Sequence, residues 1–264
     1  MSGEKRKSYF GGLPGRAAAV TGGTVKRLLF RKSTILAFAL LMIPPAISTY
    51  LLFDTPEGFN WLDMFSSMGL YIYLQILILL YCLIFGSSLI HEEIDQRTIT
   101  YVTIRGLKRW EPVIYKYAGY VISLSILFWI SIAFNYLLLG MNNGGGGILP
   151  HLDLLLALMM ISTVSIIVYG ALFMMIGIAF RKPLMVGLLF AFIWEIFIAN
   201  LPSNIKSVTI MFYLRSLYHQ WIPRGGALDL GGMTGVVTAL IALDIFTVIF
   251  LAAGILIFSR KDLH

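Results

Sequence analysis

Two acidic residues, Glu195 and Asp244, lie inside long apolar stretches of this chain. A carboxyl group is costly to place in lipid, so acids in such positions mark candidate ion or substrate pathways. Gln75 and Asn135 are polar residues in other apolar stretches and could line the same cavity. We therefore treat these four residues as a possible pathway, with no Lys or Arg expected at a comparable depth. The alternative for Glu195 is a position near enough to the outer end of its stretch to reach water.

A second group of acids follows His91, in the run His91-Glu92-Glu93-Ile94-Asp95. The zinc motif H-E-x-x-H is not complete, because Asp95 stands where the second histidine should be. A solvated helix start explains these acids, so we predict no metal site. The single cysteine, Cys82, permits neither a disulfide within the chain nor a cysteine-based metal centre.

Motifs for nucleotide binding and for hydrolysis are absent from the sequence. Neither the phosphate-binding G-x-x-x-x-G-K-[ST] nor the nucleophile motif G-x-S-x-G occurs. No set of residues suggests a catalytic centre, and we expect the chain to bind no cofactor. The sequence therefore does not predict an enzyme.

The composition is that of a protein embedded in a bilayer. Of 264 residues, 58% are hydrophobic and 12% are charged, and the mean hydropathy is +0.85. Soluble domains carry about 25% charged residues. The net charge of +7 is concentrated at the ends of apolar segments, which is typical of membrane topology and argues against a nucleic-acid partner.

Six segments are long and apolar enough to cross a membrane, since a spanning helix needs about 20 residues. We expect an all-α membrane protein with these six spans. Pro44 and Pro45 should kink the first one. The predicted spans are approximately 33–53, 65–90, 112–139, 152–180, 183–200 and 235–259.

The distribution of Lys and Arg predicts the orientation. Seventeen of the 20 lie in the N-terminal segment, in the loops after the second and fourth spans, or in the tail. Because such residues gather on the cytoplasmic side, both termini are predicted to be cytoplasmic in a multi-pass protein of the cell membrane. This divides the chain into a cytoplasmic segment 1–32, a transmembrane domain 33–259 and a cytoplasmic tail 260–264.

Two further segments have the pattern of helices that do not span. Residues 16–32 are basic and apolar and predict an interfacial helix whose Lys and Arg contact lipid head groups. In the outer segment 204–223, Ile210, Leu214, Leu217 and Trp221 form one helical stripe. With Lys206 and Arg215 inside it, this segment favours a re-entrant or interfacial helix before the last span.

The loop 91–111 is the largest one predicted on the cytoplasmic side. Its acids come first and its bases last, an order that suits the dipole of a helix. Tyr101, Ile104 and Leu107 recur at helical spacing. Such an amphipathic segment lies on the membrane or docks into the groove of a partner.

This part of the chain resembles the ABC-2 type transporter permease family. That family typically shows a Glu, then Gly-Thr, a hydrophobic stretch, a short turn of Pro, Ser or Arg, and a Lys that opens the next span. Here Glu92-Glu93, Thr98 and Lys116 occupy the corresponding places, although Arg97 replaces the Gly and Arg105-Gly106 replaces the turn. The ending 258–262, Phe-Ser-Arg-Lys-Asp, is similar as well.

The resemblance implies a permease subunit that moves substrate, usually outward, using ATP hydrolysed on a separate cytoplasmic ATPase. Two permeases, expected to be a homodimer, would join two ATPases, and ATP and magnesium would be bound by those partners. The segment 91–111 would be the coupling helix. Its candidate coupling residues are Glu92, Glu93, Asp95, Arg97, Thr98, Arg105 and Lys108.

The residues alone leave a second hypothesis open. Glu195 and Asp244 could serve an ion-coupled secondary transporter, in which intramembrane carboxyl groups bind protons or cations. The two hypotheses differ in their energy source: a partner ATPase in the first, and an ion gradient in the second.

Overall fold

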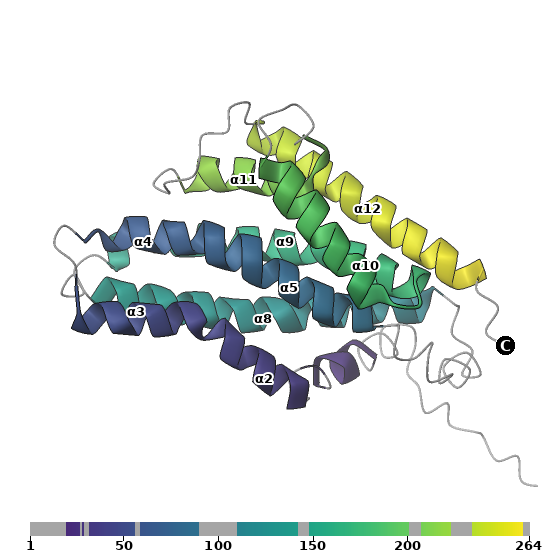
Figure 1. The fold of residues 1–264 in the computed structure, drawn as a ribbon, viewed down its shortest axis with the longest axis horizontal. Helices are drawn as coiled ribbons and strands as arrows, with labels where there is room; N and C mark the ends of the chain where they lie inside the picture. Colours follow the sequence, from purple (N-terminus) through teal and green to yellow (C-terminus); the bar gives the residue numbers. More distant parts are fainter. Residues whose placement is uncertain are drawn as a thin grey trace, which may run out of the picture.

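The structure is a computed structural model that describes residues 20–26, 28, 32–55, 59–89, 110–141, 148–200, 207–222 and 234–260. Every element in the described part of the chain is a helix, which confirms the predicted all-α class. The helices form an elongated bundle in which the longest ones run roughly along the same direction (Figure 1).

Four helices are long and apolar enough to cross a membrane, and they correspond to the second, third, fourth and sixth predicted spans. Each begins and ends within a few residues of the predicted limits. The first of the four, Trp61–Leu89, is a continuous helix that contains wider π-helical turns. The elements in these four helices are α4 (Trp61–Met68), η1 (Gly69–Ile78), α5 (Leu79–Tyr81), η2 (Cys82–Gly86), α8 (Glu111–Met141), η3 (Leu149–His151), α9 (Leu152–Ala179) and α12 (Val236–Arg260).

The first predicted span is divided into two helices, α2 (Lys32–Leu41) and α3 (Ile43–Phe53). They meet at Met42, next to Pro44 and Pro45, and Figure 1 shows α2 inclined to α3. Proline has no N–H group and its ring clashes with the preceding turn, so the helix bends here. The predicted kink is confirmed.

The kink leaves a backbone acceptor that another helix satisfies. Because Pro45 has no N–H, it cannot donate to the carbonyl group of Leu41, four residues earlier. The hydroxyl group of Ser131 on α8 donates to that carbonyl at 2.7 Å. The Tyr73 hydroxyl lies 2.9 Å from the same Ser131 oxygen. The bend is therefore fixed by contacts with two other helices.

The fifth predicted span is also helical but is less regular. It consists of α10 (Pro183–Leu189), the π-helical η4 (Phe190–Phe197) and the 3-10 turn η5 (Ile198–Asn200). The outer segment forms α11 (Ile210–Trp221), and its predicted stripe is largely confirmed, since Ile210, Leu214 and Leu217 are buried.

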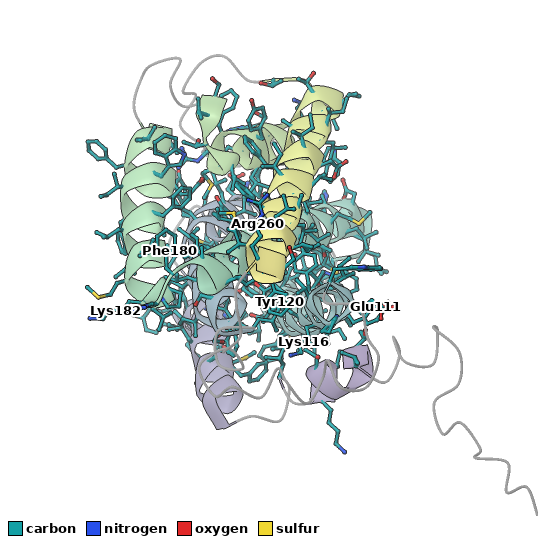
Figure 2. All side chains as sticks on the ribbon, turned by 90° about the vertical axis from the view of Figure 1, so that its right-hand side faces the viewer. Glu111, Lys116, Tyr120, Phe180, Lys182 and Arg260 are labelled. Carbon is teal, nitrogen blue, oxygen red and sulfur yellow. The ribbon has the colours of Figure 1, made fainter. Side chains whose placement is uncertain are left out.

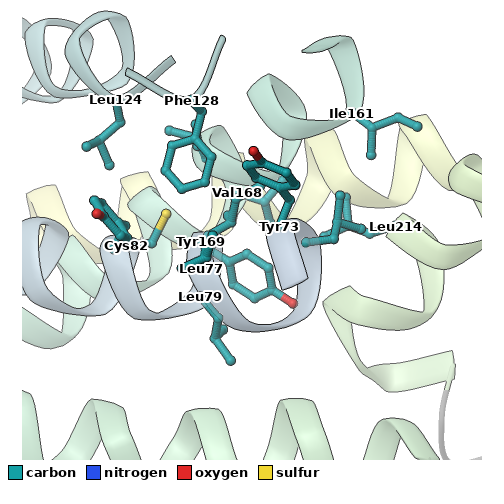
Figure 3. Packing of buried hydrophobic residues seen from close by; sticks show 14 of the residues in the cluster. Tyr73, Leu77, Leu79, Cys82, Leu124, Phe128, Ile161, Val168, Tyr169 and Leu214 are labelled. Atoms are coloured by element: carbon teal, nitrogen blue, oxygen red, sulfur yellow. The ribbon is translucent and has the colours of Figure 1, made fainter. Parts of the chain in front are cut away.

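Helix α9 lies at the centre of the bundle and packs against α8, α10, α11, α12, η1 and η2. Small residues permit the closest approaches. A Cβ atom at Gly177 would lie 2.2 Å from the carbonyl oxygen of Ser87, and one at Gly170 would lie 2.5 Å from the ring of Tyr120. Figure 3 shows the resulting core, in which Cys82, Phe128, Tyr169 and Leu214 come from different helices.

One end of the bundle carries helix ends that border segments predicted to be cytoplasmic. Figure 2 looks at this end, where Lys116, Lys182 and Arg260 lie near the ends of three different helices. Residues 20–26 are helical, and the Thr21 hydroxyl donates to the carbonyl group of Tyr115 at 3.2 Å. A Cβ atom at Gly119 would lie 2.9 Å from the Thr21 carbonyl oxygen, so this glycine lets the N-terminal helix approach α8.

Candidate functional site

The carboxyl group of Glu195 is the centre of a buried polar cluster. Its side chain is 0% exposed. The Tyr169 hydroxyl on α9 donates to one carboxylate oxygen at 2.8 Å, and the backbone N–H of Met211 donates to the same oxygen at 2.9 Å. The N–H of Ile210 donates to the other oxygen at 3.2 Å. The alternative position for Glu195, at the outer end of its stretch in reach of water, does not agree with the structure, because three donors in the protein interior surround the carboxyl group.

These donors belong to the first turn of α11. The first N–H groups of a helix lack partners within the helix, and the positive end of its dipole attracts an anion. Thr209 is the residue before α11, and its hydroxyl accepts from the N–H of Phe212 at 3.3 Å. Glu195 and Thr209 together thus satisfy the first three N–H groups of α11, and they fix where this helix begins.

Arg215, one turn further along α11, brings a positive charge to the same cluster. Its guanidinium group donates to the Gln75 side-chain oxygen at 3.2 Å and to the Ala199 carbonyl at 3.4 Å. Our expectation that no cation lies near Glu195 is wrong. The sequence places Arg215 outside the spans, whereas the fold carries it inward on α11.

Two of the four residues of the possible pathway are thus brought together, since Arg215 links Gln75 to the surroundings of Glu195. Asn135 lies elsewhere: its side chain is fully buried, accepts a hydrogen bond from Ser48 on α3, and donates to the Met68 sulfur at 3.9 Å. Asp244 is exposed on α12. The four residues do not line one cavity among the described residues.

The cluster also contains residues that sequence reasoning missed. Tyr169 gave no signal, because it is one aromatic residue in a long apolar helix. Thr209 did give one, since Thr directly before an apolar helical stripe is a typical helix start. Tyr218, further along α11, is fully buried and donates to the carbonyl group of Ser66.

The outer end of α11 is connected to the last membrane helix. The Gln220 side chain accepts from the N–H of Val236 at 3.0 Å and donates to the carbonyl group of Thr234 at 2.5 Å. The N–H of Thr234 donates to the Ser216 hydroxyl at 3.4 Å. Helix α11 is therefore held by Glu195 at its first turn and holds α12 at its last.

The candidate coupling residues, Glu92, Glu93, Asp95, Arg97, Thr98, Arg105 and Lys108, lie outside the described residues. The described chain ends at Leu89 and resumes at Trp110, at the start of α8. Figure 2 places Glu111 and Lys116 at the end of the bundle that also carries Arg260. In the described part of the chain, no group of three His, Cys, Asp or Glu could hold a metal ion.

The fold of the described residues is that of a multi-pass, all-helical membrane protein in which α11 is anchored on a buried carboxyl group. The chain belongs to the family described as "Protein of unknown function (DUF2705)", which matches residues 20–264. No curated protein matches the sequence.

Proposed function

We propose that this protein is the transmembrane permease subunit of an ABC-2 type transporter, which moves substrate across the cell membrane, usually outward, with energy from a separate ATPase. The observation that carries the proposal is the pattern from Glu92 to Lys116, between the second and third spans. In this proposal the chain, which lacks a phosphate-binding loop, receives its energy from the ATPase through this loop.

The proposal includes six crossings. The bent pair α2–α3 covers Lys32–Phe53, or 22 residues, which reach about 33 Å at about 1.5 Å per residue. The helical run from Pro183 to Asn200 provides the fifth. Six spans put both termini on one side, in agreement with the basic residues gathered at one end of the bundle (Figure 2).

In this arrangement α11 is a re-entrant helix in the outer half of the bilayer. Glu195 is 12 residues from Pro183, or about 18 Å at most, so the first turn of α11 lies near the middle of the membrane. Its 12 residues then rise about 18 Å to the start of α12. Discontinuous helices of this kind border the pathways of many transporters.

The buried cluster favours this function over an ion-coupled transporter. The carboxylate of Glu195 accepts from Tyr169, Ile210 and Met211, which are fixed parts of the bundle. Those contacts suit an anchor for α11 better than a carrier site that must bind and release an ion. Glu195 thus positions the helix that closes the outer half of the permease.

Co-purification tests the proposal. The tagged full chain is expressed in its native host and purified from the membranes, and the purified material is assayed for a P-loop protein and for ATP hydrolysis. We expect a complex with equal numbers of both chains. Reversing the charge of Glu92 and Glu93 to Lys should abolish it, whereas Asp63→Lys, at the opposite end of the second span, should not. Recovery of no P-loop protein would overturn the proposal.

A further inference from the structure

Helix α12 has one face packed on its own bundle and one face exposed. The buried side contains Ala239, Leu243, Thr247, Gly254 and Phe258. The exposed side carries β-branched residues three or four positions apart, with one acid among them. Its members, which we call the α12 stripe, are Val237, Ile241, Asp244, Ile245, Val248 and Ile249.

Asp244 lies well inside the membrane-spanning length of this helix. It is eight residues after Val236 and 16 before Arg260, which correspond to about 12 Å and about 24 Å. A hydrocarbon core is about 30 Å thick, so this carboxyl group lies within it. In the described part of the chain no group makes a hydrogen bond or ion pair with Asp244.

Lipid alone does not satisfy such a residue. Acidic residues at this depth almost always face a bundle interior or a water-filled cavity, or pair with one another, because a carboxyl group in hydrocarbon costs about 2.5–3.5 kcal/mol on insertion scales. The exposed face of α10 differs in this respect. Its residues Leu184, Met185, Leu188 and Leu189 are apolar, and lipid can cover them. The α12 stripe therefore needs a partner with a hydrogen-bonding group at the depth of Asp244.

We propose that the partner is a second copy of this chain, and that the two α12 helices pack against each other through the α12 stripe. Two copies insert with the same orientation, so a two-fold axis along the membrane normal places each residue opposite itself at equal depth. The match at Asp244 is then another carboxyl group, and a pair that shares a proton contains both a donor and an acceptor.

The residues around Asp244 suit this contact. One polar residue in an apolar helix seam fixes the register and the number of chains. The inference rests on the proposed assembly of two permeases and locates their contact. It makes Asp244 a residue of the dimer interface rather than of the pathway.

Cysteine cross-linking tests the contact in membranes that contain the full chain. In a Cys82→Ala background, Ile241→Cys and Val248→Cys on the α12 stripe should each form disulfide-linked dimers upon oxidation. Leu188→Cys, on the exposed face of α10, is the matched control and should remain monomeric. Cross-linking at residue 188 with none at 241 and 248 would overturn the inference. So would a cross-link from either stripe position to a protein of different mass.

Substitution of Asp244 gives a second, independent measurement. Hydrogen bonds between membrane helices contribute about 1–2 kcal/mol in model peptides, or about a tenfold change in association. Asp244→Asn, which retains a donor and an acceptor, should dimerise like the natural chain, whereas Asp244→Leu should dimerise about tenfold more weakly in nanodiscs. Unchanged dimerisation of Asp244→Leu would overturn the inference.

The two proposals fail separately. Dimerisation and cross-linking are measured on this chain alone and require no ATPase. If the ATPase binds while α12 makes no contact between copies, the interface is wrong and the permease function stands. If α12 cross-links in the dimer while no P-loop protein is recovered, the interface stands and the permease function is wrong.

Discussion

The hydroxyl group of Tyr169 donates a 2.8 Å hydrogen bond to the carboxylate of Glu195, which also accepts from the first turn of α11. The two residues are 26 positions apart, and this contact joins the central helix α9 to the fifth predicted span. It also sets the starting point of a helix that belongs to neither. Removing either partner should therefore affect three elements at once.

Glu195→Ala should lower stability strongly, because it leaves the Tyr169 hydroxyl and the backbone N–H groups of Ile210 and Met211 without their acceptor. Each buried donor left without a partner costs about 1–3 kcal/mol. Glu195→Gln retains an acceptor and should cost less. Thermal unfolding of the detergent-solubilised chain measures both. If Glu195→Ala were as stable as the natural chain, Glu195 would not anchor α11. Asp63→Asn, on an exposed surface, is the control.

Ser131→Ala should cost about 1 kcal/mol, because the Leu41 carbonyl then loses its donor. In a Pro45→Ala background the backbone N–H of residue 45 becomes available to that carbonyl, so the same substitution should cost less. The double-mutant cycle from denaturant or thermal unfolding gives this coupling. Additive effects would show that the kink and Ser131 act independently.

Gly177→Ala should destabilise the bundle by about 1–3 kcal/mol, since the new Cβ atom meets the Ser87 carbonyl at 2.2 Å and the helices must separate. Gly254→Ala is a matched control within another membrane helix. There the nearest atom lies at 3.6 Å, an ordinary contact, so stability should be unchanged or slightly higher. The unfolding temperature of Gly177→Ala should fall below that of the natural chain, whereas that of Gly254→Ala should be unchanged or slightly higher.

Cys82 should be unreactive toward thiol reagents in the folded protein, because its side chain is 0% exposed and packed inside the core. A fluorogenic maleimide should label it only as the bundle unfolds, at the temperature at which helical structure is lost. Trp110→Cys, at an exposed position at the start of α8, should react at once. Rapid labelling of Cys82 in the cold protein would contradict the packing in Figure 3.

Much of the fold follows from local patterns in the sequence. Apolar length predicts the four long helices, Pro44 and Pro45 predict the kink, and the stripe from Ile210 to Trp221 predicts α11. Each of these depends on residues within one or two turns of each other. A helix in this part of the chain can therefore be recognised without knowledge of its neighbours.

The site could not be predicted in the same way. The contact between Glu195 and Met211 depends on how the chain folds back between them, and no local pattern encodes that return. Arg215 indicates a segment that does not span, but no local pattern shows that its guanidinium group donates to Gln75. Asn135 and Glu195 are both polar residues in apolar helices, and only their tertiary contacts distinguish them. Asn135 accepts from Ser48, whereas Glu195 accepts from the first turn of α11.

The central position of α9 has a consequence for biogenesis. The chain is synthesised from its N-terminus, so α2, α3, the helix 61–89 and α8 enter the membrane before α9, on which the helix 61–89 and α8 pack. Until residue 179 has left the ribosome, the surfaces of α8 that later contact α9, such as the one around Tyr120, are exposed to lipid. The partly synthesised protein thus depends on the insertion machinery to cover these surfaces. A premature stop before α9 should yield fragments that membrane proteases remove quickly.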